Sequence, residues 1–82
     1  MRFFVTMNMP TRNKAAKIGP PTMVHTIIAE APVHSLEQFV EWINANQFII
    51  VDEVHNDYDS GTQFISGKII LNTNLIGKVK SE

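Results

Sequence analysis

The sequence predicts one small α+β domain, in which a single helix packs on one face of a four-stranded, mainly antiparallel sheet. Three observations lead to this prediction. The 82 residues are fewer than the roughly 100 to 200 of a typical domain. One segment repeats apolar residues at helical spacing, and four segments have strand-like patterns, in the order β-β-α-β-β. Residues 1–82 are therefore interpreted as one domain.

The first two predicted strands flank a long loop. Phe3–Met9 alternate apolar and polar side chains and form the first strand, and Met23–Glu30 resume the alternation as the second. Between them, residues 10–22 contain three prolines and one glycine, which are typical of a loop. Connections of about a dozen residues are longer than most and are usually functional or disordered. This loop is therefore a candidate for function.

The clearest element is a helix over Leu36–Ala45. Ser35 followed three residues later by Gln38 forms a capping box, in which the two side chains accept hydrogen bonds from backbone amides of the first turn. The apolar stripe keeps the i, i+3, i+4, i+7 spacing, and its members are Leu36, Phe39, Val40 and Ile43. Trp42 lies on the flank of this stripe. Asn46 is expected to end the helix in the left-handed conformation.

A hairpin is predicted after the helix. Phe48–His55 begin with apolar residues on both faces, so burial is expected to be deepest near Phe48. The turn cluster Asn56–Gly61 ends in a glycine that is expected to be left-handed, and Thr62–Leu71 form the returning strand. Gly67 within that strand indicates a bulge.

The C-terminal tail permits two structures. A cap at Asn72 or Thr73 would start a short helix over residues 73–80, although Gly77 weakens such a helix by about 1 kcal/mol relative to alanine. Continuation as a strand is the alternative.

One helix shields only one face of the sheet. Phe4, Ile27 and Phe64 are not expected all to share the helix side with Phe3, Ile28 and Ile65, so the second face is also apolar. Short chains need extra stabilisation, and a chain without cysteine has no disulfides. A C-terminal helix or a second subunit would cover this face, and the subunit is favoured. The predicted interface residues of a homodimer are Phe4, Ile27, Trp42 and Phe64.

No catalytic constellation is found, and no catalytic residue, metal ligand or cofactor is predicted. His25, His34 and His55 do not share a helical metal spacing, and a spatial site built from Asp52, His55 and Asp57 is less favoured than solvated strand-end residues. No glycine-rich elbow surrounds any serine. A metal-dependent enzyme is therefore only a poorly supported alternative.

Charge is segregated along the chain, although the net charge is only −1. Residues 1–22 contain four basic and no acidic residues, whereas residues 23–67 contain seven acidic residues and neither lysine nor arginine. Arg12, Lys14 and Lys17 in the loop are the predicted binding residues. These basic side chains can neutralise the phosphates of a nucleic acid, and Arg2 and Lys68 would add to the positive charge. An isoelectric point near 6.3 argues against a dedicated nucleic-acid binder.

The preferred hypothesis is a small non-enzymatic accessory or regulatory protein, a homodimer that binds an unidentified protein partner. A nucleic-acid-binding module using residues 12–17 is the alternative. No apolar run approaches the 18 or so residues that span a bilayer, and no signal peptide is indicated. We therefore expect a cytoplasmic protein without a membrane partner.

Overall fold

The computed structural model describes residues 1–10 and 22–82. Its elements are β1 (Arg2–Pro10), β2 (Thr22–Glu30), α1 (Leu36–Ala45), β3 (Phe48–Asp57), β4 (Thr62–Asn72), the single 3₁₀ turn η1 (Thr73–Leu75) and β5 (Ile76–Ser81). The α+β prediction is confirmed, with five strands rather than four. No helix among the described residues is long and apolar enough to cross a membrane.

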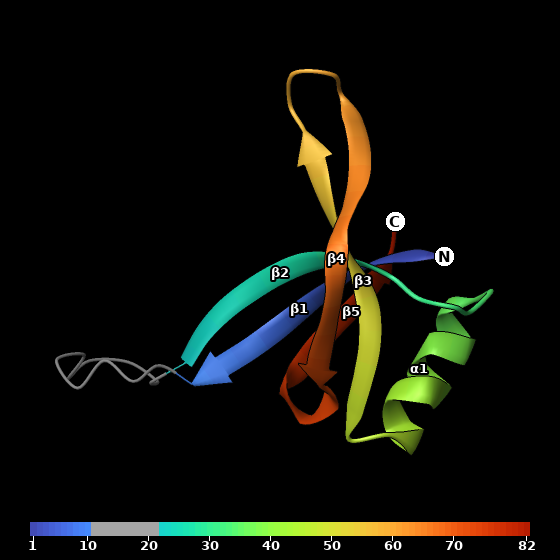
Figure 1. Cartoon of the computed structure of the whole chain (residues 1–82). Helices are drawn as coiled ribbons and strands as arrows, with labels where there is room; N and C mark the ends of the chain where they lie inside the picture. The colour runs from blue at the N-terminus through green and yellow to red at the C-terminus, as the bar shows by residue number, and fades with distance from the viewer. Residues whose placement is uncertain (11–21) are drawn as a thin grey trace, which may run out of the picture.

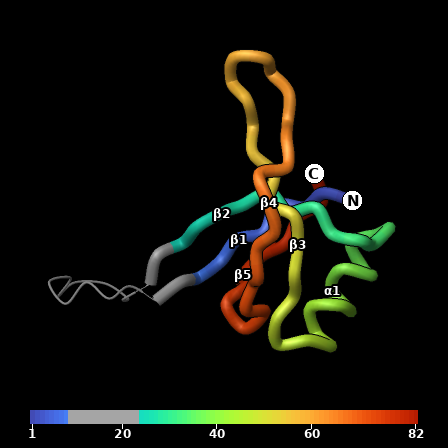
Figure 2. The backbone as a smooth tube through the Cα atoms, in the orientation of Figure 1, coloured from blue at the N-terminus to red at the C-terminus, as the bar shows by residue number. Residues whose placement is uncertain are grey.

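The five strands form one antiparallel sheet in the order β4-β3-β2-β1-β5. The β1–β2 and β3–β4 hairpins have nine and ten residue pairs, but β2 and β3 pair only where Ile28–Glu30 lie beside Asp52–Val54. The two hairpins therefore diverge on either side of a short joint. Figure 1 shows β1 and β2 running to the left and the tip of the β3–β4 hairpin rising at the top, and Figure 2 shows the same path of the chain.

Helix α1 begins where the capping box predicts. The Gln38 amide donates to Ser35 Oγ at 3.1 Å, and Gln38 Oε1 accepts from the His34 amide at 2.8 Å. The helix also ends at Ala45 as predicted, but Asn46 after it is extended (φ −136°) and not left-handed. The Asn46 side-chain amide instead donates to the Trp42 carbonyl at 3.0 Å, which satisfies a carbonyl of the last turn without a left-handed residue.

The main core lies between α1 and the sheet face turned toward it. Phe39 of α1 stacks on Phe3 of β1 with ring centroids 4.3 Å apart, and both side chains are fully buried. Alternate residues of the strands complete the core; they are Val5, Met7, Ala29, Ile49, Val51 and Leu71, with Ala31 from the connection to the helix. Burial on one face at a period of two follows from the strand pleat.

The C-terminal tail forms a strand and not the helix considered for residues 73–80. Only Thr73–Leu75 are helical, in a 3₁₀ turn capped by Asn72 Oδ1, and β5 then pairs with β1. This pairing satisfies backbone groups along the β1 edge that a helix would leave open. It also places Val79 opposite the buried Val5, so the apolar residues of the tail still pack against the core.

The β3–β4 hairpin has the predicted bulge and turn. Gly61 is left-handed (φ 71°), and the register shifts between Glu53 and Val54 beside Gly67, whose φ is 152°. Burial is deep next to Phe48, at Ile49 and Val51 (each 2% exposed), but Phe48 itself is 56% exposed. With apolar residues at successive positions, strand periodicity alone does not say which set faces the core.

Candidate interaction surface

The sheet face opposite α1, here called the exterior face, carries three exposed apolar side chains. Ile50 of β3 and Ile70 of β4 are direct cross-strand partners, and Phe48 is two residues before Ile50 on the same face. Their exposed fractions are 56% for Phe48, 56% for Ile50 and 68% for Ile70. Singly exposed apolar residues are ordinary, but a contiguous group marks an interaction site. We call these three residues the apolar patch.

A row of charged residues borders the apolar patch. The strand registers place Arg2, Glu30, Asp52 and Lys68 side by side on β1, β2, β3 and β4. Arg2 Nε lies 3.2 Å from Glu30 Oε1, and Lys68 Nζ lies 3.0 Å from Asp52 Oδ1. The Lys68 side chain is 75% exposed, so it remains open to further contacts beyond its own chain.

A hollow of about 330 Å³ opens on the exterior face, between β3 and the connection from β2 to α1. Its apolar lining comes from Met1, Ala31, Pro32, Ile50 and Val51, and its charged lining comes from Glu30, Asp52 and Lys68. Ala31 and Val51 are each only 2% exposed, since both also belong to the core. Its lining residues come from β2, from the connection to α1, from β3 and, at Lys68, from β4.

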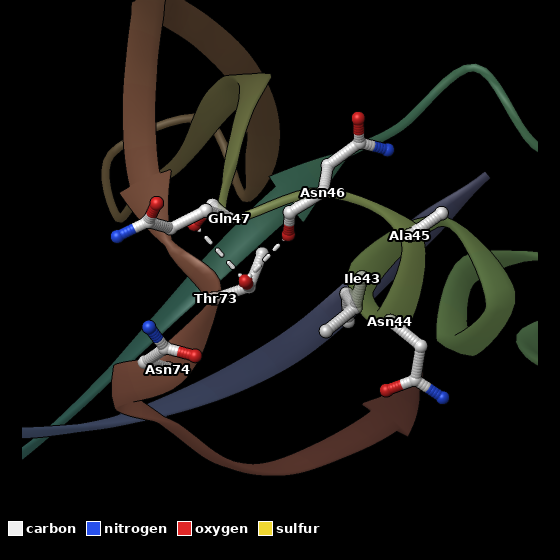
Figure 3. A pocket seen from close by; sticks show the side chains of 7 residues that line it. All are labelled: Ile43, Asn44, Ala45, Asn46, Gln47, Thr73 and Asn74. Carbon is white, nitrogen blue, oxygen red and sulfur yellow. Dashed lines mark hydrogen bonds between the residues drawn. The ribbon is translucent and has the colours of Figure 1, made fainter.

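A second hollow, of about 520 Å³, lies where α1 ends and η1 begins. Apart from Ile43 and Ala45, its lining consists of the amides Asn44, Asn46, Gln47 and Asn74 and the hydroxyl of Thr73. Thr73 Oγ1 donates to the carbonyls of Asn46 (2.6 Å) and Gln47 (3.0 Å), and the four amide side chains point in different directions (Figure 3). No lining group titrates near neutral pH, so this hollow offers no acid–base pair.

The structure disperses the four interface residues predicted from sequence. Phe4 is half-buried and faces the exterior, beside Ile28. Ile27 instead lies opposite Val5 and packs on the core, and Trp42 packs there beside Phe39, with ring centroids 6.1 Å apart.

Phe64, 49% exposed, lies in the β3–β4 hairpin beyond the bulge, with its ring centroid 6.0 Å from that of His55. The residues that sequence reasoning missed are Phe48, Ile50 and Ile70. Two consecutive apolar pairs, Ile49-Ile50 and Ile69-Ile70, were the available signal, since one member of each pair must face away from the core.

The predicted binding residues Arg12, Lys14 and Lys17 lie outside the described residues. The two supporting basic residues are described, and each already contacts an acid of its own chain, Arg2 with Glu30 and Lys68 with Asp52. The basic loop stays a prediction.

The acidic and histidine residues of the β3–β4 hairpin have separate partners. Asp52 binds Lys68, His55 Nε2 lies 3.0 Å from Glu53 Oε1, and Asp57 Oδ1 accepts from the Asp59 amide at 3.0 Å. Hydrogen bonds from Ser60 and from the Asp59 amide lower the pKa of Asp57. Within residues 1–10 and 22–82, no three histidine or acidic side chains are grouped as metal ligands would be.

Comparison with known protein families, curated proteins and solved structures found no match to this chain. Function is therefore inferred from the surface of the molecule itself.

Proposed function

We propose that this chain is a small non-enzymatic binding protein that associates into a homodimer and acts on another macromolecule by binding it. The observation that carries this proposal is the apolar patch of Phe48, Ile50 and Ile70, which leaves more than half of each side chain in water. Burial of such a surface in a complex is favourable because apolar area leaves water.

The size of the patch is compatible with association. The exposed fractions together amount to nearly two whole side chains, and full burial of one contributes about 1.5 to 3 kcal/mol. Each copy can therefore gain roughly 3 to 5 kcal/mol from the patch. Association costs roughly 4 to 15 kcal/mol in lost freedom of motion, so two patches offset the lower part of that range. We expect a dimer of modest affinity.

The molar mass in solution tests self-association. Light scattering over a wide range of protein concentration should show a rise from the monomer mass of 9.3 kDa toward twice that value. A mass that stays at 9.3 kDa at every concentration would exclude the homodimer.

Binding of nucleic acid through Arg12, Lys14 and Lys17 is the second candidate, supported by the segregation of basic residues into residues 1–22. Titration with single- and double-stranded oligonucleotides at low salt tests it. Binding that weakens steeply with added salt, and is lost when these three residues become alanine, would support this function. Absence of binding at low salt would remove it.

A further inference from the structure

We draw no further inference here: the strongest candidate, the apolar patch of Phe48, Ile50 and Ile70 on the exterior face with the hollow beside it, carries nothing further because nothing in the structure shows what covers it.

Discussion

Replacement of Ile70 by aspartate should dissociate the proposed homodimer while leaving the fold intact. Ile70 is 68% exposed, so the proposed dimer would bury about two thirds of it in each copy. Full burial of an isoleucine side chain contributes about 1.5 to 3 kcal/mol, so the loss from both copies is roughly 2 to 4 kcal/mol of association free energy. At 1.4 kcal/mol per factor of ten, Kd should rise by about thirtyfold to a thousandfold. Burial of the new carboxylate adds to that loss.

The matched control is Val24→Asp. Val24 is 64% exposed on β2 but lies away from the apolar patch, so the same chemistry is introduced at nearly the same exposure. Sedimentation equilibrium of both variants gives the dimer Kd, and urea titrations give the stability of each monomer. If Val24→Asp weakens the dimer as much as Ile70→Asp, or if neither does, the apolar patch is not the interface.

Three further variants probe the fold and one carboxyl group. Phe39→Ala removes the fully buried ring that stacks on Phe3; it should cost about 3 to 5 kcal/mol in urea denaturation, a large share of the stability of so small a domain. Ser35→Ala removes the acceptor of the Gln38 amide and should cost about 1 kcal/mol, measured as a lower Tm with an unchanged dimer Kd.

Ser60→Ala should raise the pKa of Asp57 toward its ordinary value of 3.8. NMR titration of the Asp57 carboxyl carbon measures this pKa. Because the folded-state pKa is lowered, the stabilisation is present above pH 3.8 and is lost as pH falls through the folded-state pKa. The variant should therefore lose less stability on acidification, and an unchanged Asp57 titration would contradict the role of Ser60.

Features that depend on nearby residues were predictable from the sequence. The α1 cap needs only Ser35 and Gln38, and the turn at Gly61 and the bulge at Gly67 need only glycine at a position that demands unusual backbone angles. These signals act within a few residues, so tertiary structure does not override them.

Features that depend on distant pairing were not predictable. The side of a strand that faces the core depends on its register with a strand elsewhere in the chain, so parity along β2 alone does not show that Ile27 lies opposite Val5. For the same reason, the exposure of Phe48, Ile50 and Ile70 was not predictable, because apolar residues occupy both faces of β3 and β4. The tail forms a strand because it pairs with the edge of β1. Local helix propensity carries no information about a distant strand edge.

The bulge beside Gly67 separates the β3–β4 hairpin into two mechanically different halves. The half nearer the sheet is held by the core. In the outer half, Asn56 pairs with Gln63 and Asp57 with Thr62, the turn at Gly61 closes the hairpin, and the Gln63 side chain contacts Arg2 and Glu82. Length changes at that turn would leave the register below the bulge unaltered, because the bulge absorbs local irregularity before it reaches Ile50 and Ile70. The outer hairpin is thus a natural insertion point for a fluorophore or affinity tag, and a reporter placed there would follow the proposed dimerisation without altering the apolar patch.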